Sequence, residues 1–314
     1  MTIVKYLSEK TGTEIQELNK LISQAPRMYK VYKIPKRSLG FRVIAQPAKS
    51  IKKLQRFAVE ILETILPVHE SAMAYQKDKD IKKNALLHVK NNYILKMDFE
   101  DFFNSINPEL FIKSLKKDKI LISKIDLNHL TKLLFWNPSK RKNGKLILSV
   151  GAPSSPLISN YIMYRFDCDI EEYCQLKNIT YSRYADDMTF STKEKDRLFE
   201  IPGFVKKTLK KQSYKKISIK QSKTIFSSKA HNRHVTGVTL NNQGNLSIGR
   251  ARKRMLSSFI YKACKNELNQ EELLSLVGQL GQAFYIDKIF KKSMERKYGL
   301  LTIKSILGGN NEKI

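Results

Sequence analysis

Cysteine and histidine are scarce in this sequence, and no long run of apolar residues occurs in it. The three cysteines, Cys168, Cys174 and Cys264, lack CxxC spacing, so they predict neither a disulfide framework nor a zinc site. His231 and His234 stand three positions apart without an evident third metal ligand. No signal-peptide pattern or membrane-spanning segment is evident. We therefore expect a soluble cytoplasmic protein with no membrane partner.

Acidic residues are also few in comparison with basic ones. The 314 residues include 58 Lys and Arg against 29 Asp and Glu, a formal net charge of +29. Such an excess predicts a polyanionic partner, because contacts with phosphates release counterions and dominate the affinity of proteins for nucleic acids. The alternative is a lysine-rich soluble protein whose cations only face water. The length is sufficient for one large folding unit or two to three smaller ones.

Residues 181–190 place two runs of β-forming residues around the adjacent carboxylates Asp186 and Asp187. This pattern predicts a strand, a tight turn and a second strand. Two like charges held at one turn repel each other, and burial raises the pKa of a carboxyl unless a cation intervenes. Mg²⁺ suits such a place because it prefers one or two carboxylates together with substrate phosphates. An isolated Asp-Asp pair is more often a solvated turn, but the apolar and aromatic flanks favour a site.

A third carboxylate is predicted to join this pair. Residues 93–98 have the pattern of a buried strand that ends at Asp98. With Asp186 and Asp187, Asp98 would supply ligands for two metal ions about 4 Å apart. Such a pair activates an attacking hydroxyl and stabilises a leaving pyrophosphate in an in-line displacement.

A basic hairpin is predicted near the start of the chain. Residues 28–34 and 41–44 alternate as strands on either side of the basic tip 35–40. Its cations, Arg37 and Arg42, could grip a triphosphate, although a basic tip is usually only a solvated loop. A nuclease would also use clustered acids, but it has no need of a hairpin that grips a triphosphate.

Further along, residues 146–150 resemble a strand, and a segment with one glycine and two prolines follows at 151–156. The prolines exclude a helix interior there, and residues 157–173 then take a helical pattern. Residues 235–240 and 246–248 predict a second hairpin around the turn-forming segment between them. The remainder of the chain, which opens with a basic cluster at Arg250, has helical patterns.

Four segments in order resemble the motifs of reverse transcriptases. Residues 97–103, 151–156, 184–187 and 223–224 are similar to motifs A, B, C and D of that family, in the usual order and spacing. One position departs from the pattern, because Val150 stands where the family usually has Gln before the glycine of motif B. This difference affects the pocket for the incoming nucleotide and leaves the metal ligands in place.

Two further signatures resemble those of retron reverse transcriptases in particular. They are Asn84-Ala85-x-x-His88, just before motif A, and Val235-Thr236-Gly237, after motif D. Arg250 and residues 297–299 are similar as well. The resemblance extends over nearly the whole chain, from about residue 11 to residue 299.

The resemblance implies an α+β fold, a right-hand polymerase with fingers, palm and thumb. The palm would be an antiparallel sheet with packed helices, and the thumb would be helical. We expect the N-terminal helix and fingers in residues 1–92, the palm with motifs A to D in 93–232, and the primer-grip hairpin and thumb in 233–314.

The resemblance also implies roles for individual residues. The catalytic residues, which would hold two Mg²⁺ ions, are Asp98, Asp186 and Asp187. The nucleotide site would comprise Arg37, Arg42, Phe103 under the sugar, Gly151, Ala152, Pro153 and, beside the departing pyrophosphate, Lys223. Lys223 is equally well explained as a surface lysine. The residues expected to contact RNA or primer are Asn84, His88, Val235, Thr236, Gly237, Arg250, Arg252, Lys253 and Arg254.

The implied function is that of an RNA-directed DNA polymerase. Retron enzymes extend the 2′-hydroxyl of a guanosine in their own structured RNA, so the resemblance implies the non-coding msr-msd RNA, its branched RNA–DNA product (msDNA) and deoxynucleoside triphosphates as partners. A retron effector protein and a role in anti-phage defence are implied too. Two alternatives stay open: a reverse transcriptase of the group II intron or abortive-infection kind, and a non-catalytic RNA-binding protein with a palm fold. The second would predict loss of a metal-binding carboxylate, and all three are present.

Overall fold

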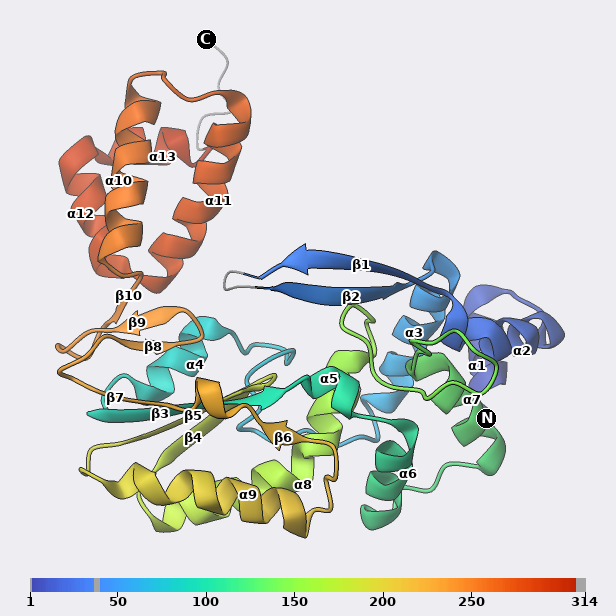
Figure 1. Cartoon of the computed structure of the whole chain (residues 1–314). Helices are drawn as coiled ribbons and strands as arrows, with labels where there is room; N and C mark the ends of the chain where they lie inside the picture. Colours follow the sequence, from blue (N-terminus) through green and yellow to red (C-terminus); the bar gives the residue numbers. More distant parts are fainter. Residues whose placement is uncertain (1, 37–39, 309–314) are drawn as a thin grey trace. The chain divides into compact units, whose positions relative to one another are not determined.

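The computed structural model describes residues 2–36 and 40–308, and its segments are mixed helices and strands (Figure 1). The packing of the chain divides it into two compact units, each built from three stretches of sequence. Unit 1 consists of Met1–Lys77, Lys96–Met188 and Phe199–Ile225, and unit 2 of Asp78–Leu95, Thr189–Leu198 and Phe226–Ile314. The predicted division into consecutive fingers, palm and thumb segments stays a prediction.

One part of unit 1 is a group of helices that pack on one another. Helix α3 buries Ile51, Leu54, Ala58 and Leu62, which recur every three or four residues and so form one apolar stripe. The helices of this group are α1 (Ile3–Thr11), α2 (Ile15–Gln24), α3 (Lys49–Leu62) and α7 (Lys124–Leu134).

A two-stranded antiparallel ribbon extends from this group. Strands β1 (Tyr29–Pro35) and β2 (Phe41–Pro47) pair along their whole length, so the predicted hairpin is confirmed. Its base is fixed by the Tyr29 ring, whose centroid lies 5.7 Å from that of Trp136. Most of the ribbon is exposed.

A five-stranded sheet carries the predicted carboxylates. Its order is β4-β5-β3-β6, with β7 also paired to β3, and β3 pairs antiparallel with β6. Strands β3 and β5 contribute residues to both units. The strands are β3 (Tyr93–Glu100), β4 (Thr180–Tyr184), β5 (Asp187–Thr192), β6 (Ser218–Ile219) and β7 (Ile225–Ser228).

Helices α8 (Ser155–Leu176) and α9 (Ile201–Lys211) cover one face of the unit 1 part of this sheet (Figure 1). Helix α8 buries Ile158, Ile162, Phe166 and Ile170, which stand four residues apart and so share one face. The helix predicted after the motif B prolines is therefore confirmed. The short helices α5 (Phe102–Ser105) and α6 (Pro108–Lys117) follow β3. The α+β class with a polymerase-type palm is confirmed.

Unit 2 combines a small sheet with helices. Strand β9 (Val238–Leu240) lies between β8 (Arg233–Val235) and β10 (Leu246–Ser247), and α4 (Ile81–His88) packs on β8 and β9. The predicted hairpin from β9 to β10 is present, but Thr236 and Gly237 are a turn rather than strand, with φ of 47° and 80°. The sequence did not show this break because both residues lie between β-forming neighbours.

A bundle of four helices completes unit 2 (Figure 1). Its apolar core includes Leu256, Ile260, Leu280 and Phe284. The helices are α10 (Arg250–Cys264), α11 (Gln270–Ile286), α12 (Lys288–Tyr298) and α13 (Leu300–Ile306). Among the residues that the structure describes, no helix has the length and apolar character needed to cross a bilayer.

Candidate active site

The three predicted carboxylates meet at the turn between β4 and β5. The backbone N–H of Phe99, next to Asp98 on β3, donates to the carbonyl of Asp186 at 3.1 Å. Ala185, inside the turn, has a left-handed backbone with φ of 57°. This turn, residues 184–187, is called the catalytic turn below, after the role that the resemblance implies for it. The structure therefore brings together carboxylates that are far apart in the sequence.

The charges at this site repel one another. Asp98 is 4% exposed. Desolvation raises the pKa of Asp187 to about 7, and a hydrogen bond with Asp98 and the charge of Asp186 add to the effect. Part of the Asp187 residue nevertheless stays exposed. Desolvation and then the charge of Asp98 likewise raise the pKa of Asp186. The cluster therefore favours either protonation or a nearby cation.

Lys223 supplies such a cation. Its Nζ lies 2.6 Å from Oδ2 of Asp98. Burial acts to lower the pKa of Lys223, but the hydrogen bond to Asp98 and the charges of Asp187 and Asp186 outweigh it, so the pKa is raised. Lys223 is therefore not merely a solvated surface lysine, and its ammonium stays charged near neutral pH.

The donor set also fits a divalent cation. Within the part of the chain that the structure describes, no three acidic, histidine or cysteine side chains stand as a ready-made cage for an ion. Crowded carboxylate oxygens with raised pKa values nevertheless match the hard ligands that Mg²⁺ prefers. Asp98, Asp186 and Asp187 are the residues that would hold the ion. The ion would then replace the Lys223 ammonium as the positive charge that neutralises these carboxylates.

Two of the predicted nucleotide contacts, Arg42 and Phe103, keep exposed surface in unit 1. Arg42 on β2 is exposed, and its charge, like that of Lys223, acts to lower the pKa of Asp186. Phe103 on α5 is half-buried, whereas Phe102 is buried and stacks on Phe99 with ring centroids 5.3 Å apart. The Phe103 ring packs edge-on against Phe102, with centroids 5.5 Å apart, and keeps part of its surface exposed. Arg37 lies outside the described residues.

The motif B loop is fastened to the base of the ribbon. Gly151 has φ of 123°, and a Cβ there would lie 3.2 Å from the carbonyl oxygen of Ala45 and 3.0 Å from Cγ2 of Ile44. Only glycine allows so close an approach in this backbone conformation. The N–H of Ala45 also donates to the carbonyl of Val150 at 2.9 Å. The glycine thus sets the position of the loop relative to β2.

The neighbouring residues of this loop divide between core and surface. Ala152 is buried with Tyr29, Ala45 and Trp136, so its side chain packs rather than contacts a ligand, while Pro153 is half-buried. The predicted strand 146–150 forms only one isolated bridge, between Ile147 and Trp136.

The two retron-like signatures lie against each other inside unit 2. The amide of Asn84 donates to Oγ1 of Thr236 at 3.5 Å, and that hydroxyl donates to the carbonyl of Ile81 at 3.4 Å. Nδ1 of His88 lies 2.7 Å from Oγ of Ser191, and burial lowers the pKa of His88 to about 3. The imidazole is therefore neutral.

This packing corrects the interpretation of three predicted RNA contacts. Asn84, His88 and Val235 are fully buried, so their side chains offer no surface to RNA. Their predicted role in binding rested on the resemblance alone, and burial cannot be read from a signature. Thr236 and Gly237, at the β8–β9 turn, are the members that keep some exposure.

The basic cluster that opens α10 also divides into two kinds of residue. Arg250 and Arg254 are exposed, and Arg252 donates to Oε1 of Gln282 at 2.7 Å. Lys253 instead pairs at 2.8 Å with Asp287, which is 1% exposed. Lys253 thus neutralises a buried carboxylate of unit 2, while 33% of its side chain stays exposed, and its predicted contact with RNA stays a prediction.

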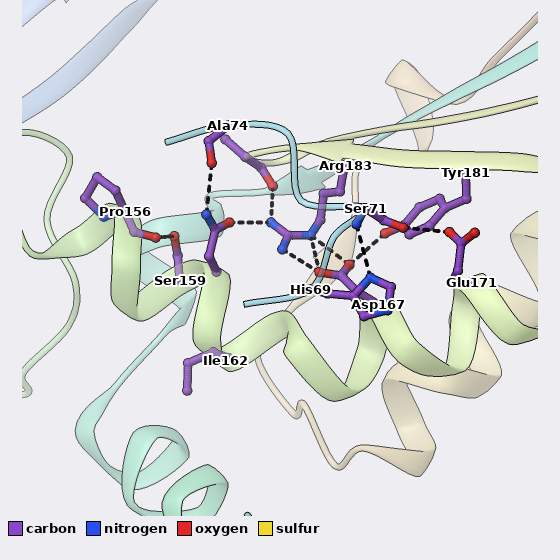
Figure 2. A network of polar contacts seen from close by, with 12 residues as sticks. His69, Ser71, Ala74, Pro156, Ser159, Ile162, Asp167, Glu171, Tyr181 and Arg183 are labelled. Atoms are coloured by element: carbon purple, nitrogen blue, oxygen red, sulfur yellow. Dashed lines mark hydrogen bonds and ion pairs between the residues drawn. The ribbon is translucent and has the colours of Figure 1, made fainter. Parts of the chain in front are cut away.

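A buried polar network that the sequence did not reveal joins β4 to helix α8 (Figure 2). Arg183 on β4 and Asp167 on α8 are both fully buried and pair at 2.6 Å. The available signals were a basic residue within an apolar strand and an acidic residue on the apolar face of a helix. Neither reveals its partner.

Comparisons with known proteins agree with this geometry. Residues 34–240 match the family model described as reverse transcriptase (RNA-dependent DNA polymerase). Over 286 residues the chain is 48% identical to the retron Ec83 reverse transcriptase of Escherichia coli, covering 91% of this chain and 92% of that protein. The retron Ec73 reverse transcriptase of Escherichia coli is 30% identical over 289 residues, with coverages of 88% and 89%.

Among solved structures, an apo telomerase from Candida tropicalis aligns with a TM-score of 0.49 at 14% identity. The alignment covers 85% of this chain and 58% of that one. A likeness of this size supports no functional inference.

The ion pair between Lys223 and Asp98 generates a prediction about metal binding. We expect Lys223→Met to bind Mg²⁺ about tenfold more tightly, because the ion no longer competes with an internal cation for a carboxylate. A Mg²⁺ titration followed by calorimetry, without nucleotide, measures this affinity. The control is Lys216→Met, which removes an exposed lysine nearby and should leave the affinity unchanged. Equal or weaker Mg²⁺ binding by Lys223→Met would contradict the prediction.

Proposed function

Since the chain belongs to the reverse transcriptase family, and within it to the retron reverse transcriptases, we propose that it copies its own structured non-coding RNA from a guanosine 2′-hydroxyl of that RNA. Its general activity is that of an RNA-directed DNA polymerase. The meeting of Asp98 with the Asp186-Asp187 turn supports nucleotidyl transfer. The observation that carries the finer proposal is the 48% identity to a retron enzyme over 91% of the chain.

The proposed mechanism assigns a role to each side chain of the site. Asp98, Asp186 and Asp187 would hold two Mg²⁺ ions, whose chemistry would be to activate the attacking hydroxyl and to stabilise the leaving pyrophosphate. The exposed guanidinium of Arg42 binds the triphosphate, and Arg37 is assigned the same role. Lys223 stays protonated beside Asp98, so it can donate a proton to the departing pyrophosphate.

The proposed partners follow from this activity. The template and primer are the msr-msd RNA, the substrates are deoxynucleoside triphosphates, and the product is branched RNA–DNA. We assign the enzyme to the cytoplasm and, together with an effector protein, to an anti-phage defence system. In the proposed division of labour, residues 1–92 act as fingers, 93–232 as palm and 233–314 as primer grip and thumb.

The alternative functions receive less support. A group II intron or abortive-infection enzyme is disfavoured by the extent of the match to retron enzymes. A non-catalytic RNA-binding protein would not need three crowded carboxylates, whose mutual repulsion costs stability without a bound cation.

The central test removes single charges from the catalytic turn. Asp186→Asn and Asp187→Asn keep the side-chain shape but remove a metal-binding charge, so primer extension should fall on the order of a thousandfold. The enzyme is expressed with its adjacent non-coding RNA, and the copurifying nucleic acid is sequenced. Wild type should carry branched RNA–DNA, and the variants should carry the RNA alone. Host RNA without a branch would contradict the retron proposal, and near-normal extension by both variants would contradict the catalytic assignment.

A second prediction concerns selection against ribonucleotides. If Phe103 lies under the sugar of the incoming nucleotide, its ring collides with a 2′-hydroxyl and tolerates a 2′-hydrogen. Phe103→Ala should raise ribonucleotide incorporation, relative to deoxyribonucleotide incorporation, by at least about tenfold. Competition assays on the folded variant measure the ratio, with Phe102→Leu as a variant of the neighbouring core ring. An unchanged ratio in an active Phe103→Ala enzyme would exclude the role.

A third prediction distinguishes the exposed arginines of α10, Arg250 and Arg254, from Lys253, which pairs with the buried Asp287. Replacing Arg250 and Arg254 by Ala should weaken RNA binding. The slope of log K against log salt should shrink by up to about 0.7–0.9 for each phosphate that the protein no longer neutralises. Lys253→Ala should instead lower the thermal stability, because Asp287 is left buried and unpaired. An unchanged salt slope in the double variant would mean that these arginines face only solvent.

A further inference from the structure

Arg183 is a fully buried cation directly before the catalytic turn. Burying a guanidinium costs free energy unless it is paired and hydrogen-bonded. Here Nε donates to Oδ1 of Asp167 at 2.9 Å, and Nη2 donates to Oδ2 at 2.6 Å. Figure 2 shows this paired interaction between the strand and helix α8. The guanidinium is therefore fixed in its plane as well as in its position.

The remaining donor group of Arg183 reaches the catalytic turn itself. Nη1 donates to the carbonyl of Ala185 at 3.0 Å and to Oδ1 of Asn160 at 3.1 Å. Ala185 has φ of 57°, a conformation that costs free energy in a residue other than glycine and persists only where the surroundings impose it. Its carbonyl joins directly to the nitrogen of Asp186. The buried cation thus holds the backbone that orients a predicted metal ligand.

Asn160 continues the network to a second strained residue. Its amide donates to the carbonyl of Ala74 at 3.0 Å, and the next residue, Tyr75, has φ of 61°. The same loop is hydrogen-bonded along β4, where the N–H of Met73 donates to the carbonyl of Arg183 at 2.7 Å. The hydrogen-bonded side chains of Arg183 and Asn160 therefore hold the backbone at two strained positions. Arg183 holds it at Ala185, and Asn160 holds it next to Tyr75.

Tyr75 is exposed at the end of this loop, with a relative exposure of 54%. The loop is paired with β4 through the bridge between Ala72 and Arg183. The loop that Asn160 holds therefore presents an aromatic ring close to the strand that leads into the catalytic turn. In agreement with this place, desolvation raises the pKa of Tyr75 and the charge of Asp186 adds to the effect.

We propose that Arg183 and Asn160 are positioning residues of the polymerase site. Arg183 sets the catalytic turn through the carbonyl of Ala185, and Asn160 sets the loop that presents Tyr75 to the nucleotide. The inference rests on the proposed roles of Asp98, Asp186 and Asp187. The network acts on geometry, because a buried ion pair contributes little net stability compared with well-packed apolar residues. Its two arms should therefore affect different kinetic constants.

The test compares single variants in steady-state primer extension with the cognate RNA. Arg183→Lys keeps the charge but loses the forked geometry that reaches Ala185, so kcat should fall about a hundredfold, the effect of a misplacement of about 1 Å. Its KM for deoxynucleotides should change less than about threefold, because Tyr75 stays in place. Asn160→Ala should raise that KM about tenfold and lower kcat less than Arg183→Lys does.

Tyr181→Phe is the matched control. It removes a buried hydroxyl that donates to Oδ1 of Asp167 at 2.8 Å, in the same network, but this group reaches neither Ala185 nor Ala74. Its kcat and KM should stay within about twofold of wild type. If Arg183→Lys does not fold, the double replacement Arg183→Met with Asp167→Leu fills the space with apolar groups. The double variant should fold and bind RNA, and its kcat should be as low as that expected for Arg183→Lys.

The outcomes distinguish this inference from the function it rests on. A folded Arg183 variant with wild-type kcat, beside an inactive Asp186→Asn enzyme, overturns only the positioning role. The same loss of kcat in Tyr181→Phe also overturns it, because the effect would then be one of general core damage. Full extension by Asp186→Asn overturns the proposed catalytic function itself.

Discussion

The crowding of three carboxylates around one β-turn is the constraint on which the rest of the site depends. Desolvation and mutual repulsion raise the pKa of Asp186 and of Asp187. Three features keep the carboxylates together: the peptide bond that joins Asp186 to Asp187, the hydrogen bond from the N–H of Phe99 to the carbonyl of Asp186, and the ion pair between Lys223 and Asp98. A site that holds like charges together without neutralising them fully is suited to bind a cation and to release a polyanionic product.

The turn can hold this arrangement because its support is rigid. Arg183, Asp167 and Asn160 lie in the interior of unit 1, where packing and paired hydrogen bonds leave few alternative positions. The strained backbone at Ala185 is maintained by that interior. Arg42, by contrast, lies on an exposed two-stranded ribbon, a place that suits the triphosphate contact proposed for it. The support of the turn is thus buried, whereas the proposed triphosphate contact is exposed.

Unit 2 shows that residues of a recognisable signature can act through packing. Asn84 and Thr236 join two distant segments, and His88 is kept neutral beside Ser191. Lys253 is similar, since it neutralises the buried Asp287 at the start of α12. Any effect of the fully buried Asn84 and His88 on RNA binding would be exerted through the segments that they hold in place. Thr236, Gly237, Arg250 and Arg254 keep the exposure that a direct contact requires.

The sequence by itself determined the paired ribbon, the helix after the motif B prolines and the turn that carries Asp186 and Asp187, because the physical causes of these features lie within a few residues of each other. The fold class and the association of Asp98 with that turn were implied by the resemblance of ordered motifs to those of reverse transcriptases. Only the tertiary structure decided the partners of Arg183, the burial of His88 and the internal pairing of Lys253. Each of these depends on side chains brought together from distant segments, 16 positions apart for Arg183 and Asp167 and 103 for His88 and Ser191. A residue type states which contacts a side chain can make, whereas the packing of the whole chain decides which contacts it makes and whether water is excluded from them.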